Sequence, residues 1–244
     1  MQTAGAEKLL ELEIESKVYG SEAGVPVEIL RHTALHLEVG SFVTLVGPSG
    51  CGKTTILRIA AGLDGDFRGK RWLAPSVRIG MVFQEPRLLA WRTVEDNIRI
   101  AMEAASVAGD IGEWLERFEL VPHRRQFAGE LSLGQARRVA VIRALSIAPN
   151  LLLLDEPLVS LDGATAARIR EQLRTIAETG RVAILLVTHD LNEAVELSDR
   201  ILFLGEQSRR VVLEEEVPIP RNQRDRKTVS ALAEELAVLA VQRN

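Results

Sequence analysis

The sequence predicts an α/β fold in which most strands of the central sheet run parallel. Short apolar runs at residues 42–46, 77–83, 151–154 and 182–187 alternate with stretches of helical composition. Continuous apolar runs are typical of parallel strands covered on both faces, and their alternation with helices is typical of a mainly parallel sheet. A chain of 244 residues is long enough for one such domain with a sizeable core.

The N-terminal segment indicates strands of another kind. Residues 9–18 alternate apolar side chains with glutamate and other polar residues, the pattern of a half-exposed strand. Residues 27–39 indicate a second pair of strands, which turns through Gly40 and Ser41 into the apolar run at 42–46. We therefore expect an antiparallel edge beside the parallel sheet.

A glycine-rich loop follows that apolar run. Its sequence is Gly47-Pro48-Ser49-Gly50-Cys51-Gly52-Lys53-Thr54, and a helical stretch that includes Thr55 continues to Gly62. The spacing fits G-x-x-x-x-G-K-[ST] in the strand–loop–helix context that the motif requires. Loop N–H groups and the helix N-terminus can hold phosphate oxygens, while Lys53 adds a charge and Thr54 a hydroxyl for Mg²⁺. The loop predicts a P-loop nucleotide-binding fold; the alternative is a turn that binds nothing.

Cys51 is the only cysteine of the chain, which excludes an internal disulfide and fits a reducing compartment. Its place beside Lys53 and a helix N-terminus could lower its thiol pKa, but the sequence favours the simpler interpretation over this one. In that simpler interpretation, Cys51 is a small side chain that fits the loop.

The apolar run at 151–154 ends in two carboxylates, Asp155 and Glu156. A carboxylate at the end of a strand that faces a P-loop is placed to hold Mg²⁺ through water. Its neighbour Glu156 can then act as general base toward an attacking water. The alternative is an acidic turn after a buried strand. The presence of a P-loop in the same chain argues strongly against this alternative.

Helical signals dominate the middle of the chain. Thr93 precedes acidic residues in the manner of a helix start, residues 111–120 carry apolar side chains on one helix face, and residues 132–148 indicate a further helix. The stretch at about 88–144 therefore predicts a separate helical lobe. Residues 164–178 indicate a helix between the last two parallel strands.

Several segments together resemble the ATPases of the ATP-binding-cassette (ABC) family. The chain is similar to the family in the order and spacing of four segments, Leu131-Ser132-Leu133-Gly134-Gln135, Asp155-Glu156-Pro157, Ser160-Leu161-Asp162 and Val187-Thr188-His189-Asp190. The resemblance covers about residues 8–205. One departure is Leu133, which stands where the family's L-S-G-G-Q signature has a glycine.

The resemblance implies a composite site. Ser132, Gly134 and Gln135 would face the γ-phosphate of ATP held by the P-loop of a second copy, so that two nucleotides lie between head-to-tail protomers. Asp162 would communicate across this dimer. The partner is a second copy of the chain or a related cassette.

The resemblance also implies roles within one protomer. Glu156, His189, Lys53 and Gln84 would be catalytic, and Thr54, Gln84 and Asp155 would hold Mg²⁺. Tyr19 would stack on adenine. For Gln84 the alternative is an ordinary loop amide, for His189 a structural histidine, and for Tyr19 packing at a strand end.

A narrower resemblance concerns residues 82–92, Val-Phe-Gln-Glu-Pro-Arg-Leu-Leu-Ala-Trp-Arg. They are similar to V-F-Q-E-P-R-L-L-P-W in ATPases of nitrate, sulfonate and taurine importers, with Ala90 in place of the proline. This implies an energy-coupling subunit, peripheral on the cytoplasmic face of the membrane, with transmembrane permease partners and an extracytoplasmic solute-binding protein acting indirectly. Trp91 would lie on the surface that receives the permease; the alternative is a packing anchor. Residues 62–75 are predicted to be a loop, shorter than the family's β-hairpin.

Composition limits the other possibilities. A net charge of −4 argues against a nucleic-acid binder, and no apolar stretch approaches the roughly 18–20 residues that span a bilayer. The glutamates within residues 1–15 argue against a signal peptide. The alternatives are an ABC ATPase of a lipid-trafficking or export system and a soluble, non-transport ABC ATPase. We expect one ABC domain at 1–205 and a C-terminal extension at 206–244 with a short helix at 231–241.

Overall fold

The computed structural model describes residues 7–20, 26–159 and 161–243. At its centre is a six-stranded sheet in the order β5-β6-β7-β3-β8-β9. Neighbouring strands are parallel except for β9, which runs antiparallel to β8. The strands span Phe42–Val46 (β3), Ile79–Val82 (β5), Leu151–Asp155 (β6), Ala183–Thr188 (β7), Arg200–Leu204 (β8) and Val211–Glu216 (β9). The predicted α/β fold with a mainly parallel sheet is confirmed.

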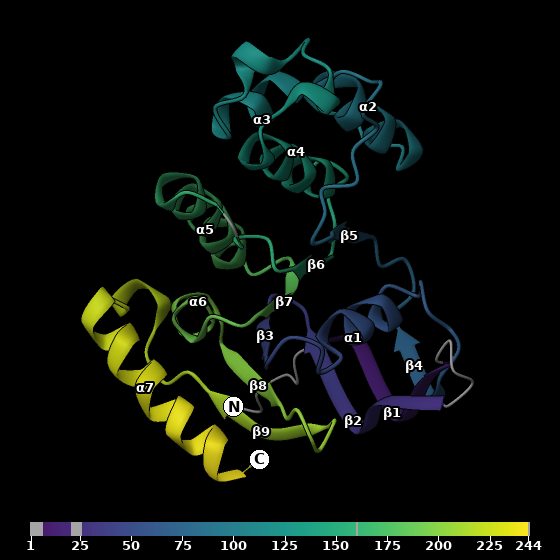
Figure 1. Ribbon diagram of the computed structural model, residues 1–244. Helices are drawn as coiled ribbons and strands as arrows, with labels where there is room; N and C mark the ends of the chain where they lie inside the picture. The colour runs from purple at the N-terminus through teal and green to yellow at the C-terminus, as the bar shows by residue number, and fades with distance from the viewer. Residues whose placement is uncertain (1–6, 21–25, 160, 244) are drawn as a thin grey trace.

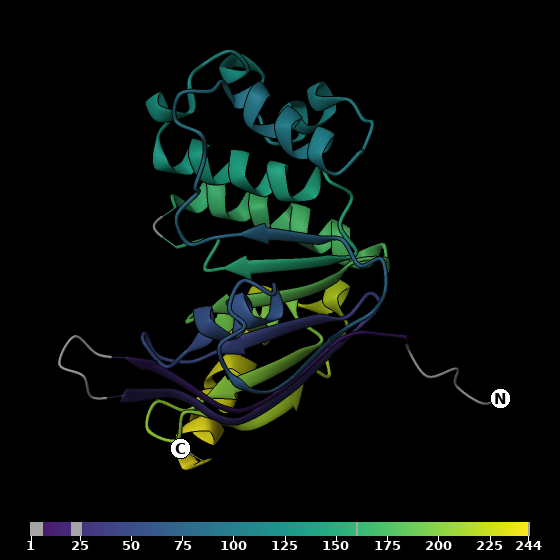
Figure 2. The ribbon, with the colours of Figure 1, turned by 90° about the vertical axis from the view of Figure 1, so that its right-hand side faces the viewer.

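A second sheet is antiparallel and has the order β2-β1-β4. Its strands are Lys8–Gly20 (β1), Pro26–Glu38 (β2) and Arg68–Leu73 (β4). Figure 2 shows β1 and β2, in purple, side by side as two long strands in the lower part of the molecule. The strand pair expected at 27–39 is one continuous strand, and the predicted loop at 62–75 contains β4, so both predictions were wrong in detail.

There is a physical reason why the sequence did not predict β4. Its side chains are mostly polar and exposed, so its sequence lacks the apolar alternation that marks a half-buried strand. It is held by pairing with β1, where Trp72 lies opposite Glu11 and Lys70 opposite Glu13. Gly69 has a φ of +139°, and a Cβ there would meet the Glu13 carbonyl oxygen at 1.9 Å. Only glycine fits this close approach.

The helices lie on both faces of the central sheet and in a lobe of their own. Figure 1 shows α2, α3 and α4 grouped at one end of the molecule, with β1 and β2 at the other. The α-helices span Lys53–Ala60 (α1), Val94–Ala104 (α2), Ile111–Arg117 (α3), Leu133–Leu145 (α4), Gly163–Glu178 (α5), Leu191–Leu197 (α6) and Arg226–Arg243 (α7). Short 3₁₀ turns are at Val121–His123 (η1), Ala128–Glu130 (η2) and Arg221–Gln223 (η3). Within the described ranges, no helix combines the length and apolar character needed to cross a membrane.

Successive side chains of the buried strands point into two different cores. Leu151 and Leu153 of β6 pack with α1 and the antiparallel sheet, whereas Leu152 and Leu154 pack with α5 and the helical lobe. All four leucines are fully buried. This arrangement explains why β6 is a continuous apolar run, and it fixes the strand that carries Asp155.

The segment after residue 205 contributes to the central sheet and to a third core. The segment predicted as a C-terminal extension contains β9, and α7 begins earlier than the helix expected at 231–241. α7 packs on α6, β8 and β9. The division at residue 205 into a domain and an extension remains a prediction.

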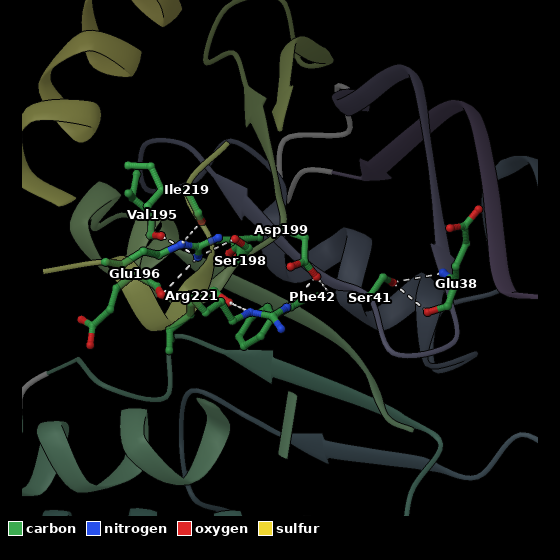
Figure 3. A network of polar contacts seen from close by, with 12 residues as sticks. Glu38, Ser41, Phe42, Val195, Glu196, Ser198, Asp199, Ile219 and Arg221 are labelled. Atoms are coloured by element: carbon green, nitrogen blue, oxygen red, sulfur yellow. Dashed lines mark hydrogen bonds and ion pairs between the residues drawn. The ribbon is translucent and has the colours of Figure 1, made fainter. Parts of the chain in front are cut away.

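Two arginines of this segment bind the C-terminal end of α6 (Figure 3). The Arg221 Nε donates to the Leu197 carbonyl at 2.9 Å. The Arg224 Nη1 donates to the carbonyls of Val195 at 2.8 Å and Ser198 at 2.7 Å. Because the last carbonyls of a helix have no intrahelical donor, these contacts fix α6 to the segment that follows β9.

Candidate nucleotide-binding site

The P-loop connects β3, which ends at Val46, to α1. Gly50 and Gly52 have φ values of +80° and +109°, which place both in the left-handed region. A Cβ on Gly52 would lie 2.6 Å from the Leu30 Cδ2, and one on Gly47 would lie 2.6 Å from the Leu204 carbonyl oxygen. The loop therefore needs glycine at Gly47 and Gly52, because β2 and β8 come so close to its backbone.

Lys53 is turned back onto the loop. Its Nζ donates to the carbonyl oxygens of Gly47 at 2.6 Å and Pro48 at 2.7 Å, and the side chain is 5% exposed. Cys51 lies beneath this contact and is also buried. Burial raises the pKa of the Cys51 thiol although Lys53 acts in the opposite direction. The favoured interpretation of Cys51 as a small side chain that fits the loop agrees with its burial, and the lowered thiol pKa was wrong.

A cavity of about 300 Å³ opens beside the P-loop. It brings together residues from β1, β2, the P-loop, the segment after β5 and the end of β6. The lining residues are Tyr19, Ile29, Ser49, Gly50, Gly52, Lys53, Thr54, Thr55, Gln84 and Glu156. A second cavity of about 380 Å³ shares Thr54 and Gln84 with the first and also contains Asp155.

Asp155 is a buried carboxylate at the carboxyl end of β6, only 2% exposed. Its Oδ1 accepts a hydrogen bond from the Thr54 Oγ1 at 3.1 Å. Burial raises the pKa of Asp155, and the nearby carboxylate of Glu156 acts in the same direction. An ionised oxygen ligand in such surroundings gains from a hard cation, so the residues present fit a magnesium ion.

Glu156 and His189 end neighbouring strands. Glu156 has a φ of +45°, and its backbone N–H donates to the Val187 carbonyl at 2.9 Å. Its largely buried carboxylate Oε1 lies 3.6 Å from the Nδ1 of His189, a half-exposed side chain. Both residues lie at the edge of the sheet where ligands collect in parallel α/β folds.

Ser132 begins α4 in the helical lobe. Its Oγ accepts from the N–H of Gln135 at 3.3 Å, and the Gln135 Oε1 accepts from the N–H of Ser132 at 2.8 Å, which makes a reciprocal capping box. The Gln135 Nε2 is also 2.9 Å from the Nε2 of His123. Leu133, which follows the cap, is 48% exposed. Its side chain at the family's glycine position therefore faces outward from the helix start.

Comparison with known proteins identifies the family. A family model described as "ABC transporter" matches residues 30–159, more than half of the chain. The chain belongs to the ABC transporter family.

Two bacterial relatives of this ABC chain are similar over most of their length. The aliphatic sulfonates import ATP-binding protein SsuB of a Bacillus cereus strain is 40% identical over 85% of this chain and 86% of the relative. The aliphatic sulfonates import ATP-binding protein SsuB 2 of a Burkholderia cenocepacia strain is 43% identical over 91% of this chain and 84% of the relative.

Solved ABC structures have the same fold. The dimeric post-hydrolysis structure of the ATP-binding cassette MJ0796 bound to ADP and Pi is 28% identical, with a TM-score of 0.76 over 87% of this chain and 100% of that chain. Together with the family match and the import relatives, this makes the ABC chain an ATP-binding subunit and an ATPase. Its hydrolysis of ATP to ADP and phosphate is coupled to transmembrane transport.

The predicted site residues of this ABC subunit fall into two groups. The P-loop, Tyr19 and Gln84 meet at the cavity with Glu156, and Asp155 and His189 adjoin them. Ser132, Gly134 and Gln135 are not among the residues that line this cavity in the described part of the chain. Asp162 caps α5 and accepts from the N–H of Thr165 at 2.9 Å, and Ser160 lies outside the described residues.

One residue at the site, Ile29, was not predicted from the sequence. Ile29 lines the cavity at a register shift, because β1 pairs Lys17 with Leu30 but Val18 with Glu28. Trp91 is 71% exposed, so the packing-anchor alternative was wrong. Its large apolar surface is open on the lobe side of the molecule.

Proposed function

We propose that this subunit drives import of a small sulfonate-like anion, as one half of a head-to-tail pair of ATPase subunits beneath a membrane permease. The observation that carries the proposal is the 40–43% identity to aliphatic sulfonate import ATP-binding proteins over at least 84% of each relative compared. The same proposal places the subunit as a peripheral protein on the cytoplasmic face of the membrane. The exposed Trp91 supports a permease contact on the lobe side.

In this proposal the cavity holds a nucleoside triphosphate. The P-loop N–H groups, the start of α1 and Lys53 would hold the phosphate oxygens, and Tyr19 would stack on the base. Mg²⁺ would be held by Thr54, Asp155 and Gln84, and when bound it supplies positive charge toward the phosphate oxygens. Among the described residues no cluster of three or more His, Cys, Asp or Glu side chains could hold a metal. Phosphate and water oxygens would therefore complete the coordination.

Hydrolysis needs a base, a positioned water and charge stabilisation. Glu156 would accept a proton from water as the water oxygen bonds to the γ-phosphorus and the bond between that phosphorus and the β,γ-bridging oxygen breaks, which releases ADP and phosphate. His189, 3.6 Å from the Glu156 carboxylate, would orient that carboxylate and donate to the γ-phosphate. Gln84 would orient the water, and Lys53 would stabilise the negative charge on the transferred group.

A second protomer would complete the site. Ser132 is exposed at the start of α4, and the first N–H groups of a helix, here those of Leu133 and Gly134, have no intrahelical acceptor. Such a helix start can take a phosphate oxygen. Ser132, Gly134 and Gln135 would therefore contact the γ-phosphate held by the partner's P-loop, with Asp162 near the dimer interface.

Reconstitution with the permease tests the proposed function. We expect the subunit to co-purify with a multi-span permease, and the complex in lipid vesicles to hydrolyse ATP faster when its solute-binding protein carries an alkanesulfonate. Taurine and nitrate are the matched alternative solutes, and the complex with Lys53→Ala is the inactive control. Stimulation by lipid or by an exported compound, with no response to any of the three anions, would contradict the importer assignment while leaving the ATPase intact.

A further inference from the structure

A buried charged side chain lies beside the proposed binding site for the nucleotide base. The side chain of Lys17, on β1, is fully enclosed at 2% exposure, and a buried ammonium is costly unless it is paired. Lys17 is not among the residues that line the cavity, so phosphate binding and hydrolysis do not account for it.

One carboxylate joins Lys17 to Tyr19. The Lys17 Nζ donates to the Asp64 Oδ1 at 2.8 Å and also to the backbone carbonyl of Asp66. The Tyr19 hydroxyl donates to the other oxygen of the same carboxylate, Asp64 Oδ2, at 2.8 Å. The Lys17 Nζ lies 4.5 Å from the centre of the Tyr19 ring. The tyrosine is thus held at its hydroxyl and over one ring face.

Lys17 and Asp64 favour each other's charged form. Burial opposes the charge on Lys17, but the hydrogen bond and negative charge of Asp64 outweigh it and raise the pKa of Lys17. Burial likewise opposes ionisation of Asp64, and the hydrogen bonds from Lys17 and Tyr19 outweigh it and lower the pKa of Asp64. A cation at this distance from an aromatic ring is attracted to the ring face.

The same contacts tie the ring to the P-loop helix. Asp64 follows the end of α1, where the N–H groups of Leu63 and Asp64 donate to the carbonyl of Arg58. α1 begins at Lys53 in the P-loop and is about 12 Å long at 1.5 Å per residue. One helix therefore carries the phosphate-binding loop at its start and the carboxylate that holds Tyr19 just beyond its end.

We propose that Lys17 and Asp64 are positioning residues for the nucleotide base, which hold the Tyr19 ring with one face covered and the other free to stack. The proposal rests on the proposed function, because it requires a nucleotide in the cavity. With the ammonium on one face of the ring, the base stacks on the opposite face, toward the cavity that Tyr19 lines. A preset ring loses less conformational freedom when the base binds.

The test compares ATP with inorganic triphosphate, which has no base to stack. Lys17→Met/Asp64→Asn removes both charges while keeping the volume, and Tyr19→Phe removes only the hydroxyl. Tyr19→Ala removes the ring, and Lys70→Met, at an exposed lysine on the neighbouring strand, is the matched control. Binding constants for both ligands are measured by competition against a fluorescent ATP analogue, and kcat and KM for ATP by phosphate release.

We expect Tyr19→Ala to weaken ATP binding about tenfold, in the range of one lost base–aromatic stack. The charge-pair variant should lose about threefold or more, and Tyr19→Phe about twofold or more, with triphosphate binding and kcat unchanged. In the Tyr19→Ala background, replacing the pair should have no further effect, because its action passes through the ring.

Three results would overturn the proposal. An equal loss for ATP and triphosphate would make the pair merely structural, and unchanged ATP binding in the pair variant and in Tyr19→Phe would remove any positioning role. An effect of the pair that persists without the ring would show another route of action. If the charge-pair variant does not fold, Tyr19→Phe decides alone. A wild-type chain that binds neither ligand would instead refute the proposed function.

Discussion

Glu156 has a backbone conformation that residues with a side chain seldom adopt. Its φ is +45°, and such strain persists where surrounding contacts enforce it, often at functional sites. Here the hydrogen bond from its N–H to the Val187 carbonyl holds the peptide, and the pairing of β6 with β7 ends just before it, at Asp155 and Val187. The strain therefore aims a carboxylate at the edge of the sheet beside the P-loop.

Glu156→Gln tests the proposed general base. Glutamine keeps the volume and one acceptor oxygen of the side chain but cannot accept a proton from water. We expect steady-state ATP hydrolysis to fall about 100-fold or more, with ATP affinity retained. Glu116→Gln, at an exposed position of the helical lobe, is the control and should hydrolyse ATP at the parent rate. Parent-like hydrolysis by the Glu156 variant would remove it from the role of base.

At the residue scale, the sequence predicts the local part of the site and misses its long-range part. Lys53 and Thr54 follow from a motif of consecutive residues, and Asp155 from its place after an apolar run. The contact between Lys17 and Asp64 joins residues 47 positions apart. It depends on how β1 packs on the end of α1, which no local pattern in the sequence contains.

Elements with strong local signals were predicted well, and elements defined by their partners were not. β6 and β7 are fully buried runs close to the predicted bounds. β4 and β9 are partly exposed edge strands that owe their form to pairing with β1 and β8. The start of α7 had a usable signal, because Asp225 accepts from the N–H of Thr228 at 2.8 Å and so begins the helix.

The first turn of α2 is tied to the segment after η1 by an ion pair. Both Arg124 Nε and Nη2 donate to the Glu95 carboxylate, at 2.8 and 2.9 Å. These hydrogen bonds, which outweigh burial, hold the pKa of Glu95 at about 2. A carboxyl whose folded-state pKa is lowered contributes stability that is present above its unfolded pKa and is lost as pH falls toward the folded value.

Glu95→Gln tests this contribution. At pH 7 we expect the variant to melt about 2–4 °C below the parent. The gap should persist down to about pH 4.5 and close between about pH 4.5 and 2, where the parent's Glu95 becomes protonated. Glu103→Gln, exposed on the same helix, is the control and should melt at the same temperature as the parent at each pH. A gap of constant size from pH 7 to pH 3 would contradict the assignment to the charge of Glu95.

The contact between Arg224 and the end of α6 can also be tested. Burial lowers its pKa to about 10, so it stays charged at neutral pH, and its guanidinium binds the carbonyls that end α6. Arg224→Ala leaves these carbonyls without their donor and should cost about 2–3 kcal/mol of unfolding free energy. Urea unfolding measures this loss, with Arg226→Ala, exposed in the first turn of α7, as the control. Equal midpoints for the two variants would show that α7 is held by its apolar face alone.

At the scale of the whole molecule, the residues of the proposed site lie in two separate parts of one protomer. The P-loop and Glu156 lie at the central sheet, whereas Ser132 begins α4 in the helical lobe that Figure 1 shows at the far end. The described cavity beside the P-loop holds no residue of α4. The proposed function therefore expects a protomer alone to bind ATP through the P-loop, with the contacts from Ser132 to the γ-phosphate supplied by a second copy.

This division predicts a dimer that depends on ATP and on Ser132. Glu156→Gln slows hydrolysis, so ATP should accumulate between two protomers and shift the variant from monomer to dimer in size-exclusion chromatography with light scattering. Adding Ser132→Arg places a long charged side chain at the helix start that would approach the partner's nucleotide. The double variant should stay monomeric with ATP while its ATP affinity stays within about twofold of the single variant, because the phosphate-binding loop is untouched.

Ser230→Arg, exposed on α7, is the matched substitution and should leave the dimer intact. A double variant that dimerises normally, or one that loses ATP binding as fully as Lys53→Ala, would contradict the division of the site between two copies.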